Sequence, residues 1–218
     1  MCYNFCMSSF VAEIKNKPFS LVVEIPSISS SFLQAAYDNG ADFVRIKPLS
    51  FYDLQNAKDA LKISKLLMGL DLMNIKEKIK IKDVQKFSFL TFPFHARKNQ
   101  KLENIRLPVI LRLSTLYSLD EIVSMKKNSL AVLEADIVPK PGWGREMINA
   151  DLQNYISIAL ASKTPVLVPT QRNLLPSEMA ILWDAGIKGV VLTSEFLGND
   201  IEQFENKLQA FSSAIKEL

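Results

Sequence analysis

The chain has 218 residues, of which 48% are apolar and 22% are charged. A disordered chain would have fewer apolar residues and a larger net charge. The counts of 7 Gly, 10 Pro and 2 Cys also exclude collagen-like chains and small disulfide scaffolds. No stretch approaches the about 18 consecutive apolar residues of a membrane-spanning helix, so we expect a globular protein without a membrane partner.

The formal net charge of +3 comes from 26 basic and 23 acidic residues that are interleaved along the chain. Because no basic tail or face stands out, we expect no nucleic-acid partner. Cys2 and Cys6 lie close together without a third cysteine, a spacing that indicates two reduced thiols rather than a metal site. The N-terminus lacks the basic and apolar regions of a signal peptide, and we expect a cytoplasmic protein.

Eight short runs with a strong β pattern recur along the chain. Each is nearly continuous in apolar residues, which is typical of strands buried on both faces in a parallel sheet with helical crossovers. The intervals between the runs carry helical patterns, such as the one that follows Ser29 to Ser31 and ends at Asn39-Gly40. The runs start at Leu21, Phe43, Leu66, Phe87, Pro108, Ala131, Pro165 and Gly189.

This alternation predicts an α/β protein with a single (β/α)8 barrel domain over residues 1–218 and short loops. Residues 1–18 are an N-terminal cap segment in this prediction, with a short helix over 9–17 that covers the bottom of the barrel. An open doubly wound sheet has the same alternation and is the alternative. A leucine-rich repeat has a similar period, but its L-x-x-L-x-L frame does not recur here.

Polar residues interrupt the runs near their C-terminal ends, where barrel enzymes carry their active sites. A charge on the outer strand face would be buried against apolar helices, so we expect these charges to point into the barrel near its mouth. Four are candidate catalytic residues, and six are candidate substrate-binding residues. The former are Glu24, Lys47, Glu134 and Asp136, and the latter are Arg45, Asp71, Arg112, Thr170, Arg172 and Thr193.

Each candidate also has a structural interpretation, in which the charges form a salt-bridge network that fills the barrel. Lys47 would be a Schiff-base nucleophile if it were desolvated, or a cation paired with Glu24 or Asp71. His95, the one histidine of the sequence, would be a general acid or base, or a solvated loop residue.

We predict no cofactor and no metal site. Glu134 and Asp136 could bind a divalent cation through oxygen ligands, which is the alternative. The loops after the last two runs lack the glycines that cradle a phosphate, although Arg172, Thr193 and Ser194 could still hold an anion. The longest loop carries Trp143, which predicts a lid over the mouth or a packed surface loop.

The segment PVLVPTQRNLLPSEMAILWDAGIKGVVL, residues 165–192, resembles the late βαβ unit of 2-keto-3-deoxy-6-phosphogluconate-type aldolases, which are (β/α)8 barrels. A strand leads to a helix start similar to T-P-S-E, then to an Ala-Gly turn and the next strand. In that family, the Schiff-base lysine lies on this second strand, where the present chain has Val191 and Leu192. The glycine-rich phosphate loop of the family is also missing, so no catalytic residue is carried over.

The strand-end charges favour an enzyme of the lyase or isomerase type that acts on a small anionic metabolite, a carboxylate or phosphate. Arg45, Lys47 and Arg112 would hold the anion, and Glu24, Glu134 or Asp136 would move a proton. The alternative is a barrel that has lost catalysis and serves as a binding or assembly module. A flavin- or phosphate-cofactor barrel is disfavoured by the missing glycines, and homo-oligomerisation stays open.

Overall fold

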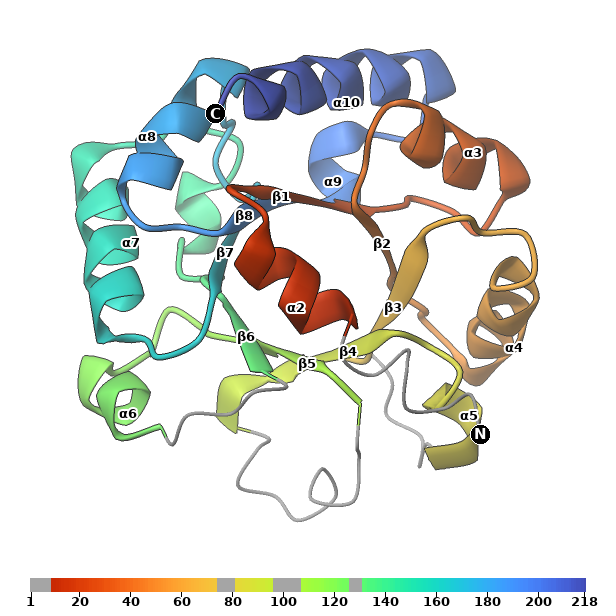
Figure 1. The fold of residues 1–218 in the computed structure, drawn as a ribbon, viewed down its shortest axis with the longest axis horizontal. Helices are drawn as coiled ribbons and strands as arrows, with labels where there is room; N and C mark the ends of the chain where they lie inside the picture. The colour runs from red at the N-terminus through yellow and green to blue at the C-terminus, as the bar shows by residue number, and fades with distance from the viewer. Residues whose placement is uncertain (1–8, 74–80, 96–106, 126–130) are drawn as a thin grey trace.

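The computed structural model describes residues 9–73, 81–95, 107–125 and 131–218, and there it shows a closed barrel of eight parallel strands (Figure 1). The strands pair in chain order, and β8 pairs with β1, which excludes the open sheet. The predicted (β/α)8 barrel is confirmed, whereas Cys2 and Cys6 lie outside the described residues. The strands are β1 (Ser20–Glu24), β2 (Phe43–Ile46), β3 (Leu67–Asp71), β4 (Phe89–Pro93), β5 (Val109–Arg112), β6 (Ala131–Glu134), β7 (Val166–Pro169) and β8 (Gly189–Leu192).

Helices surround the strands as an outer layer, and their starts follow ordinary capping rules. The side chains of Ser29, Ser50 and Asp200 each accept a hydrogen bond from a backbone N–H three residues on. The helices are α2 (Ser9–Asn16), α3 (Ser30–Asp38), α4 (Phe51–Ala60), α5 (Ile81–Val84), α6 (Leu119–Ser124), α7 (Asn149–Ala161), α8 (Met179–Asp184), α9 (Ser194–Leu197) and α10 (Ile201–Lys216), with 3-10 turns η2 (Lys140–Gly142) and η3 (Pro176–Glu178).

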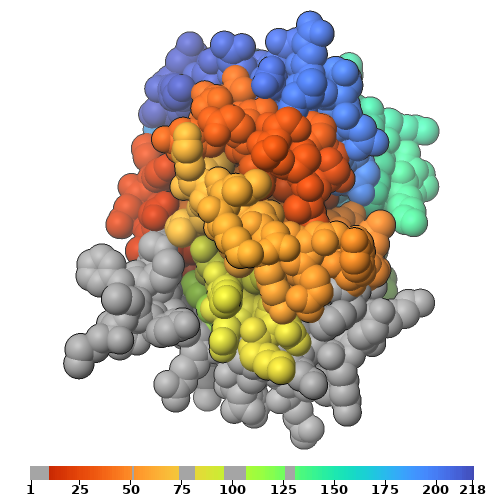
Figure 2. Space-filling model, turned by 90° about the vertical axis from the view of Figure 1, so that its right-hand side faces the viewer, coloured from red at the N-terminus to blue at the C-terminus, as the bar shows by residue number. Residues whose placement is uncertain are grey.

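The outer layer is continuous on the side of α3, where α10, α3 and α4 follow one another over the surface (Figure 2). Helix α10 buries Phe204, Leu208 and Phe211, which lie on one face at helical spacing. Phe32 of α3 meets Phe204 edge to face, with ring centroids 5.0 Å apart. No helix in the described ranges is long and apolar enough to cross a lipid bilayer.

Helix α2 closes the bottom of the barrel, as predicted, and lies across the ring of strands in Figure 1. The ring of Phe10 stacks on Phe89 with centroids 4.1 Å apart, and it meets Phe43 edge to face at 4.8 Å. These rings belong to an apolar cluster inside the barrel, separate from the larger core between the strands and the helices. The lower half of the barrel is therefore filled by apolar side chains.

We call this inner apolar cluster the plug. Toward the C-terminal ends of the strands, the inward side chains change from apolar to charged within one step of the strand alternation. On β1, Val22 lies in the inner apolar cluster and Glu24 follows two residues later, and on β5, Ile110 is followed in the same way by Arg112. Because all strands are parallel, their C-terminal ends meet at one mouth. The charged layer consequently lies between the apolar plug and the mouth.

Gly69 is required by the plug, because a Cβ at this position would lie 2.1 Å from the ring of Phe89. We expect Gly69→Ala to lower the free energy of unfolding by about 1–3 kcal/mol through overpacking. Urea denaturation of the variant measures this loss, and Phe89→Leu in the same chain should recover part of it by vacating the space. A Gly69→Ala variant as stable as the unmodified protein would contradict this account of the plug.

Candidate functional site

Arg45 is the centre of the charged layer, and its side chain is only 1% exposed. Its Nε and Nη2 lie 3.0 Å and 2.8 Å from Glu24 Oε2, and Nη1 donates to Glu134 Oε2. A buried guanidinium is tolerated when carboxylates satisfy its donors in this way. Arg45 was predicted to bind substrate, but all three of its nitrogens are engaged by the protein itself.

Arg112 extends the network across the barrel. Its Nη2 lies 2.6 Å from Asp71 Oδ2, and its Nε lies 3.0 Å from Glu134 Oε1 and 3.6 Å from Asp136 Oδ2. Glu134 thus bridges the two arginines. Asp71 is fully buried and also accepts a hydrogen bond of 3.0 Å from the backbone N–H of Met73. Two of the three Arg112 nitrogens are therefore held by carboxylates, and Asp71 fixes the position of the guanidinium.

The arginines keep Glu24 and Glu134 ionised. Burial alone would raise the pKa of Glu24, but Arg45, Lys47, the Ser194 hydroxyl and Arg112 together lower that pKa to about 2. Burial likewise opposes ionisation of Glu134, and Arg112 and Arg45 overcome it and lower its pKa. Glu24 and Glu134, both predicted as catalytic, are weak bases in this setting.

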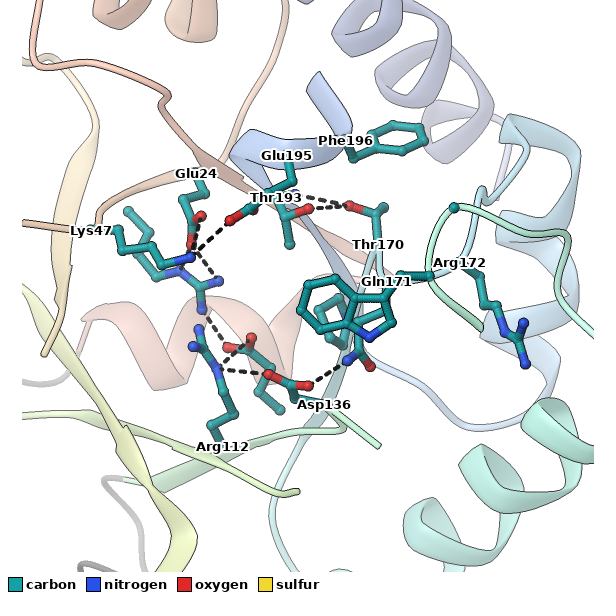
Figure 3. Close-up of a pocket in the computed structure, with 15 residues that line it drawn as sticks. Glu24, Lys47, Arg112, Asp136, Thr170, Gln171, Arg172, Thr193, Glu195 and Phe196 are labelled. Atoms are coloured by element: carbon teal, nitrogen blue, oxygen red, sulfur yellow. Dashed lines mark hydrogen bonds and ion pairs between the residues drawn. The ribbon is translucent and has the colours of Figure 1, made fainter. Parts of the chain in front are cut away.

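A pocket of about 200 Å³ opens above this layer at the mouth of the barrel (Figure 3). It brings together nine of the ten predicted site residues, all except Asp71. Asp136 and Lys47 have side chains that are 29% and 28% exposed, so a ligand can reach them. The lining residues are Glu24, Arg45, Lys47, Arg112, Glu134, Asp136, Trp143, Gly144, Pro169, Thr170, Gln171, Arg172, Thr193, Glu195 and Phe196.

Asp136 differs from Glu24 and Glu134 in the direction in which its pKa is shifted. Burial and the negative charge of Glu134 raise its pKa to about 6, against the opposing effect of Arg112 and Arg45. Its Oδ1 accepts a hydrogen bond from Gln171 Nε2, which orients the carboxyl group. A partly exposed carboxyl that titrates near neutral pH suits a general acid or base.

Lys47 stays a cation in the pocket. Its Nζ lies 3.0 Å from Glu195 Oε1 and 3.9 Å from Glu24 Oε1. Burial lowers the pKa of Lys47, but Glu24 and Glu195 more than compensate and raise it. A Schiff-base nucleophile needs a neutral amine, so the geometry favours the paired-cation interpretation of this residue.

The loop between β6 and α7 forms a packed wall of the pocket. The backbone N–H of Gly144 donates to the carbonyl of Gln171 at 2.8 Å, and Asn173 N–H donates to Arg145 O at 2.8 Å. Trp143 Nε1 donates to the carbonyl of Val138 at 2.9 Å. These bonds tie the loop to the end of β7, which favours the packed loop over the lid.

Arg172 is directed away from the charged cluster in Figure 3, although part of it lines the pocket. Its Nη1 donates to Gly142 O at 2.8 Å, and its Nε and Nη2 lie 2.8 Å and 3.1 Å from the carboxylate oxygens of Asp151. Asp151 also accepts a bond of 3.1 Å from Ile148 N–H at the start of α7. Arg172 was predicted to bind substrate, but its guanidinium supports the pocket wall.

Thr170 and Thr193 lie together at the ends of β7 and β8. Their hydroxyl oxygens are 3.1 Å apart, and Thr193 N–H donates to Thr170 Oγ1 at 2.9 Å. His95 lies outside this pocket, with Nδ1 3.9 Å from Glu121 Oε2 and a side chain that is about half exposed. In the described ranges, no three His, Cys, Asp or Glu side chains are arranged as ligands of a metal ion.

Six of the fifteen lining residues were not among the predicted site residues: Trp143, Gly144, Pro169, Gln171, Glu195 and Phe196. Gln171 lies two positions after the inward Pro169, and Glu195 two positions after Thr193. Extending the strand alternation past the strand ends would have selected both. Strand alternation does not select Trp143, whose loop was predicted to be a lid over the mouth or a packed surface loop.

No protein-family model matches this chain, and no curated protein matches it. Among solved structures, thiamine phosphate pyrophosphorylase from Pyrococcus furiosus has 15% identity over 92% of this chain and 97% of that chain, with a TM-score of 0.61. Phosphoribosylanthranilate isomerase from Thermotoga maritima has 11% identity over 92% and 100%, with a TM-score of 0.60. KDPGal aldolase in its native form has 18% identity over 90% and 94%, with a TM-score of 0.61.

At these identities the likeness shows the fold alone. It extends the barrel resemblance of residues 165–192 to most of the chain.

Acid should destabilise the protein through Glu24. Its folded-state pKa of about 2 lies below its ordinary value of 4.5, so its contribution is fully present above pH 4.5 and is lost as the pH falls toward 2. We expect this group alone to cost roughly 3 kcal/mol of unfolding free energy over that range. Urea titrations at several pH values should show a shallower loss in Glu24→Gln, and parallel curves for the two proteins would contradict this assignment.

Removal of Arg172 should loosen the pocket wall. We expect Arg172→Met, made in a Trp183→Phe background so that Trp143 is the remaining tryptophan, to shift the fluorescence of Trp143 to the red as the loop opens. It should also lower the unfolding free energy by about 3–5 kcal/mol, because Asp151 loses its buried counter-charge. Asp151→Asn in the same chain should restore stability without restoring the emission. Unchanged emission in Arg172→Met would remove Arg172 from this role.

Proposed function

We propose that the protein is an enzyme of the lyase or isomerase type that moves a proton on a small anionic metabolite at the mouth of the barrel. Asp136 takes and returns the proton, and Lys47 binds the negative group of the substrate. The observation that carries this proposal is the presence, in one open pocket, of a carboxyl whose pKa is raised to about 6 and a charged lysine.

Asp136 is the best proton carrier of the network because it is both reachable and matched in pKa. Efficient general acids and bases titrate near the working pH. The pKa values of Glu24 and Glu134 are lowered, and both side chains are almost completely buried. These two groups set the electrostatics of the site and leave the proton transfer to Asp136.

The substrate's negative group is better explained as a carboxylate than as a phosphate. Barrels commonly bind phosphate at the start of a short helix after the eighth strand. Here the Ser194 N–H and Oγ donate to Glu24 Oε1 at 3.4 Å and 2.8 Å, so the protein's own carboxylate takes up these donors. A dianion would also face the unfavourable charge of Glu24, Asp136 and Glu195.

The chemistry requires no group from outside the chain. Asp136 removes a proton from a carbon next to a carbonyl group. The electron pair of the C–H bond forms a carbon–carbon double bond, and the π electron pair of the carbonyl group moves onto its oxygen. Lys47, which holds the adjacent carboxylate, stabilises the resulting enolate. Return of the proton to a different carbon completes an isomerisation, whereas loss of a leaving group from the neighbouring carbon completes an elimination. The proposal includes no cofactor, metal, nucleic acid or membrane partner, and it places the reaction in the cytoplasm.

The alternative function is a catalytically inactive barrel that serves as a binding or assembly module. It is supported by the extensive internal pairing of Arg45 and Arg112, which leaves those two residues few donors for a ligand. The open pocket and the raised pKa of Asp136 are not required by a module. Proton exchange separates the two functions.

We expect the protein to exchange the methyl protons of pyruvate for deuterium in D2O faster than Asp136→Asn does. The rate should rise with pH and reach half of its plateau near pH 6, because Asp136 must be deprotonated to act as a base. Proton NMR of the pyruvate methyl signal measures the exchange. Dihydroxyacetone phosphate, tested in the same way, reports on a phosphate substrate.

The matched control is Asp184→Asn, which removes an exposed carboxylate on α8 and should leave the rate unchanged. Equal exchange rates in the unmodified protein, Asp136→Asn and buffer, with both compounds, would favour the inactive module.

A further inference from the structure

The carboxylate of Glu195 pairs with the Lys47 ammonium on the side of the pocket that faces solvent. Its side chain is 56% exposed, and its Oε1 lies 3.0 Å from Lys47 Nζ. Its Oε2 lies 3.2 Å from Ser194 Oγ, whose shorter contact of 2.8 Å is with Glu24. In Figure 3, Glu195 and Glu24 approach the Lys47 ammonium together.

A ligand can replace the exposed Glu195 on Lys47 more easily than it can replace the buried carboxylates on Arg45 and Arg112. Arg45 and Arg112 are held by carboxylates that are almost completely buried, so displacing those carboxylates would leave an unpaired buried charge. Glu195 can instead turn into water, where its charge is well solvated. Exposed ion pairs of this kind change an equilibrium constant by no more than about fivefold.

We propose that Glu195 occupies, in the free protein, the subsite that a small carboxylate ligand takes when it binds. The ligand's carboxylate replaces that of Glu195 on Lys47, and the Glu195 side chain moves into solvent. This inference rests on the proposed function, since it identifies where the substrate's negative group lies. No covalent bond changes in the step, because one ion pair replaces another.

The surroundings of Lys47 restrict the ligand to a small monocarboxylate. Glu24 stays 3.9 Å from the ammonium and is fixed by Arg45, so one negative charge beside Lys47 persists after Glu195 leaves. A second charge on the ligand would be repelled by it. The pocket volume of about 200 Å³ sets a matching limit on size.

The test is the affinity for acetate and for pyruvate, followed by the backbone amide shift of Thr193 in NMR titrations. We expect Glu195→Gln to bind both carboxylates two- to fivefold more tightly than the unmodified protein, because Lys47 no longer has a competing internal partner. Glu205→Gln removes an exposed carboxylate from α10 and should bind as the unmodified protein does. Lys47→Met should abolish binding in both backgrounds, and Lys47→Arg should restore it.

Equal or weaker binding by Glu195→Gln would overturn the inference, and so would binding that survives Lys47→Met. Inorganic phosphate in place of acetate should show little gain in Glu195→Gln, and a larger gain than acetate would contradict the monocarboxylate subsite.

The result of the binding test for the subsite can be distinguished from the result of the proton-exchange test for the proposed function. Tighter acetate binding by Glu195→Gln together with no proton exchange would retain the subsite and reject the enzyme. Asp136-dependent exchange without any effect of Glu195→Gln would retain the enzyme and reject the subsite.

Discussion

The structure depends on a buried ionic layer in which Arg45 and Arg112 are held between Glu24, Glu134 and Asp71. Charges this deeply buried cost several kcal/mol each unless every one is paired. Here the five groups come from five different strands, so the pairing is complete only when the barrel is closed in the correct register. The layer therefore adds little net stability relative to an apolar filling, but it disfavours other arrangements of the strands.

The same layer determines which residues are left for chemistry. Because the arginines are neutralised from within, the pocket above them has more carboxylates than cations. Burial and that excess of negative charge raise the pKa of Asp136 to about 6. The negative charge also raises the pKa of Lys47, against the opposing effect of burial. The buried arginines and their carboxylate partners, which in the sequence resemble a substrate site, thus form the floor of the pocket. Asp136 and Lys47, the next residues toward the mouth, are the candidates for the reaction.

The alternation of strands and helices predicted the barrel, the strand positions and the cap helix because these features follow from local periodicity. Period-two alternation also brought Glu24, Arg45, Arg112 and Glu134 to the inside. Local patterns could not predict which of them pair, because that depends on the stagger between strands distant in the sequence. They also did not predict that the Arg172 guanidinium, which follows a strand and lines the pocket, turns toward Asp151 on α7. Glu195 was not among the predicted residues, although the alternation continued two positions past Thr193 selects it.

Replacement of Glu195 by a ligand carboxylate would have one further consequence for the charge balance. A ligand that simply added a negative charge beside Asp136 would raise the pKa of Asp136 further and protonate the base that the reaction needs. If Glu195 moves into water as the ligand arrives, the number of negative charges near Lys47 stays the same. Asp136 then keeps a pKa close to that of the free protein. An exposed carboxylate of the protein beside Lys47 would in this way let a pocket with an excess of negative charge accept an anion without protonation of Asp136.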